Sequence, residues 1–148
     1  MFGLVTNWKF SADKADADRW AEVYADLASF VRGEIVALPR NPPRNKRARF
    51  APLMAPESEI WEYRHQSKKH RTIRIFGRFA SKDCFAGLIW RYRGDLPEND
   101  DWKQEKKETA REWQKLFEPL KGVLRNEHKN PPYPEGYYDE YVSNYVLV

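Results

Sequence analysis

Three segments in the middle of the chain alternate apolar and polar residues with the period of a β-strand. They run from Ser58 to His65, from Arg71 to Phe79 and from Cys84 to Arg93. The connections between them, Gln66 to His70 and Ala80 to Asp83, are short and polar, as in antiparallel hairpins. The pattern therefore predicts a three-stranded antiparallel meander with one apolar face and one face rich in arginine.

Alternation also assigns side chains to faces. In the second segment Ile73, Ile75 and Phe79 lie opposite Thr72, Arg74, Phe76 and Arg78, and in the third Cys84, Ala86, Leu88, Trp90 and Tyr92 lie opposite Phe85, Gly87, Ile89, Arg91 and Arg93. Arg74, Arg78, Arg91 and Arg93 can therefore share a face, with Tyr92 on the other one. In the first segment either face can be the core one: Ile60, Glu62 and Arg64 oppose Trp61, Tyr63 and His65.

Two further stretches have helical periodicity. Ala17 to Arg32 carries an apolar stripe of Trp20, Val23, Tyr24, Leu27, Phe30 and Val31. Trp102 to Phe117 carries a second one, made of Trp102, Thr109, Ala110, Trp113, Leu116 and Phe117 and reaching Leu120. Each stripe predicts an amphipathic helix that packs on the sheet. Phe2 to Phe10 is a candidate opening strand.

Two segments do not fit this regular pattern. Residues 34–57 contain five prolines, which interrupt a helix or a central strand, and we interpret them as a basic insertion. Residues 119–148 form an aromatic C-terminal extension, which we expect to dock on the body or on another chain; its acidic stretch, Glu135 to Glu140, is a candidate cover for the cationic sheet. The whole chain of 148 residues is expected to be one α+β domain, with a small antiparallel sheet, mixed at one edge, against amphipathic helices.

Charge is unevenly distributed along the chain. The net charge is +4, but Arg32 to Arg93 hold fifteen basic and five acidic residues, a balance of +10, and the flanks hold eleven and seventeen, a balance of −6. Such a region attracts polyanions such as nucleic acid, or else only keeps a sheet surface solvated. The basic residues of the insertion, Arg40, Arg44, Lys46, Arg47 and Arg49, form either an arm that contacts a nucleic-acid backbone or a solvated loop.

Several kinds of chemistry find no support in the sequence. A single cysteine, Cys84, excludes an internal disulfide, and no His, Cys or carboxylate cluster has the spacing of a metal site. No apolar run has membrane-spanning length and no secretory signal is present, so we expect a cytoplasmic protein without a cofactor or a membrane contact.

The strand sequences resemble a known family. Ile60-Trp-Glu-Tyr-Arg64, Thr72-Ile-Arg-Ile-Phe76 and Ala86-Gly-Leu-Ile-Trp90, the last leading into Arg91-Tyr-Arg93, are similar to the sheet of the RelE/ParE toxin superfamily, in particular its HigB-like, phage-associated branch. The resemblance covers about Leu53 to Phe117, with Ala110 in the helix that follows the sheet. It implies a toxin of a type II toxin–antitoxin or phage-associated system: a metal-free endoribonuclease that cleaves mRNA, typically in the ribosome, and is neutralised by a cognate antitoxin.

That chemistry needs a base for the ribose 2′-hydroxyl, cations for the phosphorane and an acid for the leaving oxygen. By the resemblance, Arg74 stabilises the phosphate, Arg91 or Arg93 forms the basic end of the last strand, and Tyr92 is near a position where some members have a tyrosine. Glu62 and Arg64 match a pair that is often structural, although Glu62 can serve as a base if it faces the groove, and Arg78 adds to the nucleic-acid surface. His65 and His70 are alternative bases.

Three functions stay open at this point. The first is the RelE-like ribonuclease. The second is a non-catalytic nucleic-acid-binding or gyrase-directed protein on the same scaffold. The third is an interaction module, a homo-oligomer assembled through the aromatic tail, in which the arginines only solvate a surface.

Overall fold

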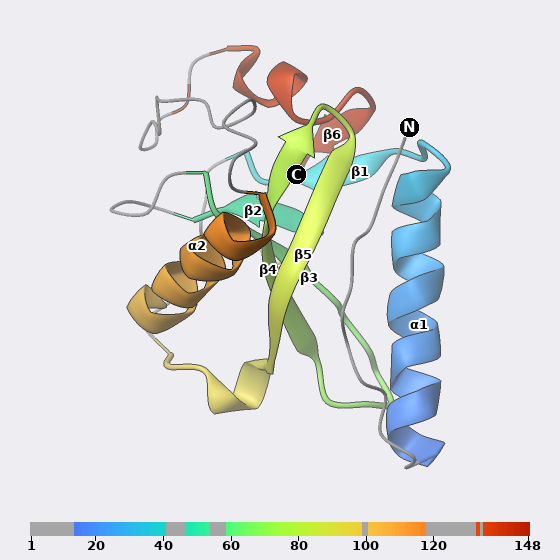
Figure 1. The fold of residues 1–148 in the computed structure, drawn as a ribbon. Helices are drawn as coiled ribbons and strands as arrows, with labels where there is room; N and C mark the ends of the chain where they lie inside the picture. The colour runs from blue at the N-terminus through green and yellow to red at the C-terminus, as the bar shows by residue number, and fades with distance from the viewer. Residues whose placement is uncertain (1–13, 41–46, 54–58, 99–100, 118–132, 134) are drawn as a thin grey trace.

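Two helices and six strands, in an α+β arrangement, make up most of the described chain (Figure 1). The computed structural model describes residues 14–40, 47–53, 59–98, 101–117, 133 and 135–148, so that the predicted strand Phe2 to Phe10 and Leu120 lie outside the described residues. The elements in chain order are α1 (Lys14–Val31), β1 (Val36–Leu38), β2 (Phe50–Pro52), β3 (Trp61–Arg64), β4 (Ile73–Ser81), β5 (Cys84–Tyr92), the 3-10 turn Arg93–Asp95, α2 (Lys103–Phe117), the 3-10 turn Tyr137–Glu140 and β6 (Tyr145–Leu147).

The central sheet has four antiparallel strands in the order β2-β3-β4-β5. Its last three strands are the predicted meander, and in their register Arg64 is opposite Arg74 and Arg74 is opposite Arg91. The prediction of a mixed edge is wrong: parallel pairing occurs in a separate two-stranded sheet, where β1 pairs with β6. The predicted α+β class is confirmed.

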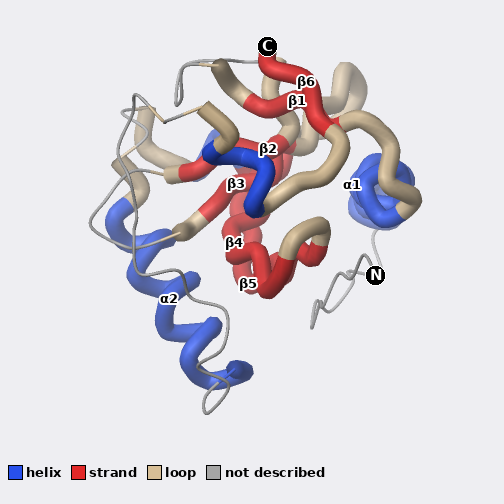
Figure 2. Tube along the Cα trace, turned by 90° about the horizontal axis from the view of Figure 1, so that it is seen from above, coloured by secondary structure: helices blue, strands red, loops and turns tan. Residues whose placement is uncertain are grey.

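The two helices lie on opposite sides of the central sheet (Figure 2). α1 covers the face that carries Trp61 and Tyr63, and this side holds the larger core. α2 covers the other face, where Trp102 and Ala110 pack with Phe76 and Ile89 in a smaller cluster. Because both faces are covered, residues from alternate positions of one strand enter two different environments.

The helical stripes are largely as predicted. Trp20, Val23, Leu27 and Phe30 are buried beneath α1, and Trp102, Thr109 and Trp113 are buried at α2. Tyr24 and Val31 are exposed instead, because each lies one residue, or about 100°, beyond a buried position of the narrow stripe. Leu116 is also exposed, since burial along α2 ends at Trp113.

One β-bulge changes the predicted faces of β5. Phe76 pairs with Ile89 but Gly77 pairs with Gly87, so Leu88 is an extra residue on this strand. Leu88 and Ile89 both pack in the cluster beneath α2, and Phe85 joins the core beneath α1. Placing Phe85 on the arginine side is therefore wrong, because regular alternation stops at the bulge.

The proline-rich segment 34–57 is partly built into the two sheets. β1 pairs with the C-terminal strand β6, and β2 forms an edge of the central sheet, with Phe50 opposite Tyr63. Pro52 is the last residue of this edge strand, where the missing N–H of a proline is tolerated. The segment is thus not only an insertion, although residues 41–46 and 54–58 lie outside the described part.

The described part of the aromatic extension docks on the body, as predicted. Tyr138 and Tyr141 are buried, with ring centroids 5.9 and 4.9 Å from that of Trp61. Trp61 lies beneath α1, on the face opposite its neighbour Glu62. The expected cover over the arginine face is therefore wrong, because the extension packs on the other core.

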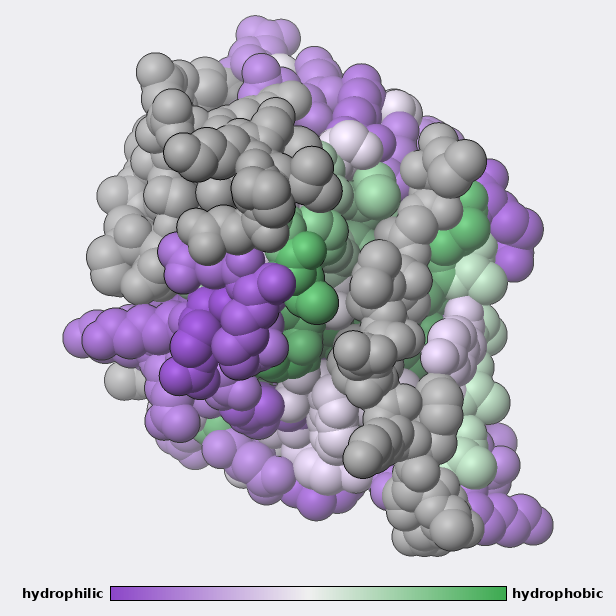
Figure 3. Space-filling model, in the orientation of Figure 1, coloured by the Kyte–Doolittle hydropathy of each residue, from purple (hydrophilic) through white to green (hydrophobic). Residues whose placement is uncertain are grey.

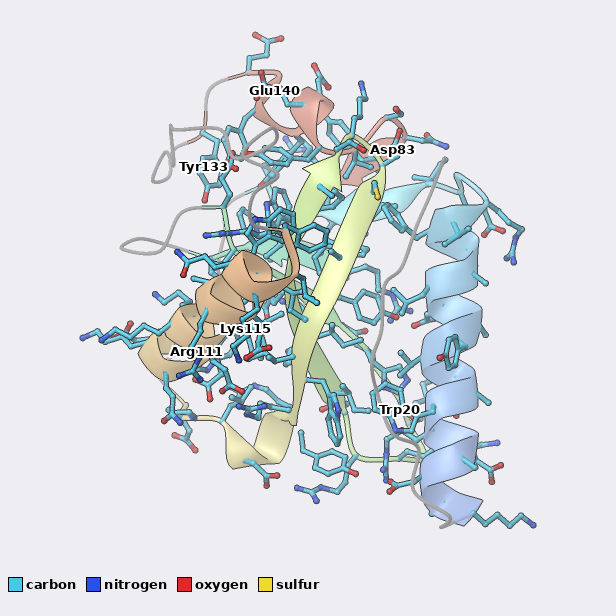
Figure 4. All side chains as sticks on the ribbon, viewed as in Figure 1. Trp20, Asp83, Arg111, Lys115, Tyr133 and Glu140 are labelled. Carbon is cyan, nitrogen blue, oxygen red and sulfur yellow. The ribbon has the colours of Figure 1, made fainter. Side chains whose placement is uncertain are left out.

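The turn between β4 and β5 fastens the extension in place. Asp83, in the left-handed region with φ of 61°, accepts a hydrogen bond from the backbone N–H of Ser143 at 2.7 Å and another from its hydroxyl. The backbone N–H of Asp83 donates to the carbonyl of Tyr141 at 2.8 Å. Figure 4 shows Asp83 beside the end of the chain. The extension is thus part of the fold where it is described.

Candidate nucleic-acid interface

Three arginines form a line across β3, β4 and β5, and we call Arg64, Arg74 and Arg91 the arginine row. Each is the direct cross-strand partner of the next. Their guanidinium groups lie on the α2 side of the sheet, where they meet Glu62 and the carboxylates of α2. Like charges directly opposite each other destabilise a sheet, so the row requires anions to hold it.

Glu62 holds the inner end of the row. Its side chain is 1% exposed, and Oε1 accepts from Nε of Arg64 at 2.6 Å while Oε2 lies 3.3 Å from Nε of Arg74. A carboxylate buried this deeply must be paired to remain charged. Because both oxygens contact guanidinium groups, Glu62 is placed to hold the row rather than to take a proton from a substrate.

The outer end of the row is held by α2. Nη2 of Arg91 pairs with Glu108, and Nε of Arg91 lies 3.9 Å from Glu105. Side-chain exposure rises along the row, from 8% at Arg64 through 15% at Arg74 to 32% at Arg91. A ligand from solvent therefore reaches the row at Arg91 first.

Arg78 and Arg93 lie on the same side but beyond the row. The guanidinium of Arg78, a buried residue, is 5.7 Å from the ring centroid of Trp113, and that of Arg93 is 5.8 Å from the ring centroid of Trp102. Trp113 is a buried residue of α2, and Trp102 directly precedes this helix. The structure thus brings all four predicted same-face arginines to the α2 side, and two of them pack against tryptophan.

Tyr92 is on the α1 side, away from the arginine row. Its hydroxyl donates to Asp16 at 3.1 Å and accepts from Nη1 of Arg19 at 2.9 Å, and the guanidinium of Arg71 lies 3.9 Å from its ring centroid. Burial, together with the hydrogen bond to Asp16, raises the pKa of Tyr92. The structure therefore does not bring this predicted site residue to Arg74 or Arg91.

The two alternative bases, His65 and His70, also lie beside α1. Their Nε2 atoms are 3.4 and 3.7 Å from the carboxylate of Glu22. His65 is buried, and burial lowers its pKa although Asp26 and Glu22 act against this. Nη1 of Arg74 lies 3.4 Å from the backbone carbonyl of His65, but both rings face Glu22 of α1, so neither is placed as a base for a phosphate bound at the row.

The buried imidazole predicts a pH-dependent stability. The folded-state pKa of His65 is below the 6.5 of an exposed histidine, so the unfolded chain binds this proton more readily. We expect the free energy of unfolding to fall as the pH drops below about 6.5. Urea unfolding between pH 7.5 and 5.5 measures this, and His65→Gln should flatten the dependence while the more exposed His70→Gln leaves it. An equal slope in the His65→Gln protein would contradict the assignment.

The described basic residues of segment 34–57, Arg40, Arg47 and Arg49, are not part of the arginine row. Arg44 and Lys46 lie outside the described residues, and Arg40 and Arg47 are exposed. Arg49 pairs with Asp26 of α1 at 3.2 Å, on the side opposite the arginine row. A nucleic-acid-binding arm in this segment stays a prediction.

The sequence reasoning missed the contribution of α2. Glu105 and Glu108 hold Arg91, and Lys103, Lys107 and Arg111 follow the outward side of the same helix. The spacing of three residues between the two glutamates, and of four between the basic residues, is visible in the sequence and indicates that each set shares a helix face. The sequence does not indicate which face of α2 packs on the sheet beside Arg91.

Comparison with known proteins identifies no relative: no family model, curated protein or solved structure matches this chain. Within the described residues, no three His, Cys, Asp or Glu side chains come together in a way that suits a metal ion. Neither described helix combines the length and the apolar character that crossing a membrane requires.

Proposed function

We propose that this protein binds RNA through its arginine row, on a scaffold similar to the RelE/ParE toxins. The observation that carries the proposal is the row itself: three arginines in register, held by carboxylates instead of apolar packing. Replacing such buried ion pairs by apolar residues is often neutral or stabilising, so the fold alone does not call for them. The planar guanidinium fork matches phosphate oxygens, which makes a phosphodiester the fitting ligand.

Access to the row is from the side of Arg91. Its partner Glu108 is 26% exposed, and the second carboxylate, that of Glu105, is 3.9 Å away. A phosphate that displaces Glu108 from Arg91 exchanges one anion for another, so the guanidinium is never left without a counter-charge. Glu62 meanwhile continues to hold Arg64 and Arg74.

Metal-free cleavage of mRNA is the second candidate, in a toxin with a cognate antitoxin as partner. It is favoured by the direct pairing of Arg74 with Arg91, since two neighbouring cations suit the charge that builds on a phosphorane. Among the described residues, however, the candidate bases are elsewhere or already paired: Tyr92 and His65 lie beside α1, and Glu62 contacts two arginines. RNA binding therefore comes first and cleavage second.

Replacing Arg91 with glutamine should weaken RNA binding about tenfold or more, because one charge-assisted contact to phosphate is lost. The fold should persist, since the side chain is 32% exposed. Fluorescence anisotropy with a labelled single-stranded RNA measures the affinity. Arg32→Gln is the matched control: it removes the same charge from an exposed pair with Glu34, beyond the end of α1. Equal affinities of the two variants would reject the site.

Gel analysis of the same RNA separates the candidate functions. New ends with the wild type, lost in Arg91→Gln, would establish the ribonuclease, and their appearance in chelator would establish that it needs no metal. Binding without new ends supports the binding protein. If the wild type neither binds nor cleaves the RNA, both candidates are rejected, and the gyrase-directed protein and the module that oligomerises through its aromatic C-terminal extension remain.

A further inference from the structure

The outward side of α2 carries a line of basic residues, Lys103, Lys107 and Arg111, which we call the α2 stripe. The members are four residues apart and all are exposed, while Glu105, Lys106, Thr109 and Trp113 are turned toward the sheet. Figure 3 shows the corresponding surface as strongly hydrophilic, and Figure 4 shows Arg111 and Lys115 along the same helix. The stripe is thus separate from the arginine row, on the other side of α2.

Helix stability does not explain the α2 stripe. Like charges four residues apart disfavour a helix. Lys115 is paired with Glu112 at 2.6 Å, and Lys103 lies 3.2 Å from Asp101, but Lys107 and Arg111 form no ion pair with any described residue. Both side chains are exposed, so they are open to a ligand from solvent.

The α2 stripe borders a hollow that shares one residue, Glu108, with the outer end of the arginine row. The hollow has a volume of about 470 Å³ and is lined by Lys103, Gln104, Lys107, Glu108 and Arg111. Glu108 is the residue that pairs with Arg91. The stripe and the outer end of the row therefore meet at one side chain.

We propose that the α2 stripe binds the phosphodiester backbone of RNA and leads the strand across Glu108 to Arg91. This rests on the proposed RNA-binding function and extends it. Successive members of the stripe are separated by one helical turn, about 6 Å along the axis, which is similar to the distance between neighbouring phosphates in a nucleic-acid strand. The stripe contacts phosphates and no base edges, so its contribution is independent of sequence and sensitive to salt.

RNA fits the α2 stripe better than a protein partner does. The hollow is lined by charged and amide side chains alone, with no apolar or aromatic residue among the described ones. Protein interfaces have an apolar centre from which charged residues are depleted. A line of one sign of charge is the arrangement that a polyanionic backbone requires.

The test compares two triple variants with the same loss of charge. Lys103→Gln, Lys107→Gln and Arg111→Gln remove the α2 stripe; Lys68→Gln, Lys69→Gln and Lys82→Gln remove three exposed lysines from the β3–β4 and β4–β5 connections. Binding of a fluorescein-labelled single-stranded RNA is measured between 50 and 200 mM salt. The stripe variant should lose about 30-fold in affinity, and its slope of log K against log salt should become shallower by about 2, as for three lost phosphate contacts.

The control variant should stay within about threefold of the wild type, with the original slope. Equal losses in both variants, or an unchanged slope in the stripe variant, overturn the inference. If Arg91→Gln weakens binding but the stripe variant does not, the stripe fails and the proposed function stands. If the wild type does not bind RNA, both fail. Equally tight, stripe-dependent binding of polyglutamate would reassign the stripe to an acidic protein partner.

Discussion

Replacing Glu62 with glutamine is expected to destabilise the protein by about 3–5 kcal/mol, the cost of removing one partner from a buried ion pair. Glu62 is the inner anchor of the arginine row and is almost fully buried between Arg64 and Arg74. Glutamine keeps the size but not the charge, so two buried guanidinium groups lose their shared anion. Urea or guanidinium unfolding, followed by tryptophan fluorescence and circular dichroism, measures the change.

Glu112→Gln is the matched control for this substitution. Glu112 pairs with Lys115 on the exposed surface of α2, and exposed pairs contribute about 0–1 kcal/mol. The same chemical change should therefore have little effect there. A Glu62→Gln protein within 1 kcal/mol of the wild type would contradict the description of Glu62 as the anchor of the row.

An apolar version of the inner row separates the needs of the fold from those of the ligand. Glu62→Met, Arg64→Met and Arg74→Leu together remove both the anion and the cations that it holds, which is often neutral or stabilising at a buried site. Such a protein should be more stable than Glu62→Gln and should bind RNA more weakly than the wild type. A folded apolar variant with unchanged RNA affinity would show that only the outer end of the row contributes to binding.

The sequence predicts the parts of this fold that follow from regular periods. The meander and both helices are confirmed, because alternation and the 3.6-residue period directly report which side of an element is buried. The docking of the described part of the extension was expected from its aromatic composition instead. Arg74 and Arg78 share a side because the extra residue of the bulge, Leu88, is on β5 and leaves the alternation of β4 intact between them. Arg91 follows the bulge and pairs directly with Arg74, and Arg93 lies two residues further, beside Trp102.

The rest depends on contacts between distant segments. The bulge at Leu88 moves Phe85 to the other face, and it arises from the pairing of β4 with β5 rather than from either strand alone. The carboxylates of Glu105 and Glu108 meet Arg91 only because α2 packs across this face. For Tyr92 the two kinds of sequence signal disagreed. The resemblance suggested a catalytic tyrosine near this position, whereas the alternation placed Tyr92 opposite the arginines. The structure agrees with the alternation, since the Tyr92 hydroxyl contacts Asp16 of α1.

Gly77 lies where the backbone of β5 leaves no room for a side chain, and Gly77→Ala is expected to destabilise the protein by more than about 3 kcal/mol. A Cβ atom at this position would lie 1.9 Å from the carbonyl oxygen of Ala86 and 2.8 Å from Cζ of Phe85, so β4 and β5 would have to separate beside the bulge. The same substitution at Gly94, where the nearest atom would be Nη2 of Arg71 at 4.0 Å, should change the free energy of unfolding by less than about 0.5 kcal/mol. Chemical denaturation of the two variants tests the close pairing of Gly77 with Gly87 beside the bulge at Leu88. Similar stabilities would mean that the strands are not this close. Arg91 follows this bulge on β5, so a change in the pairing of β4 with β5 would also displace its guanidinium group. A Gly77→Ala protein that still folds should therefore show weaker RNA binding.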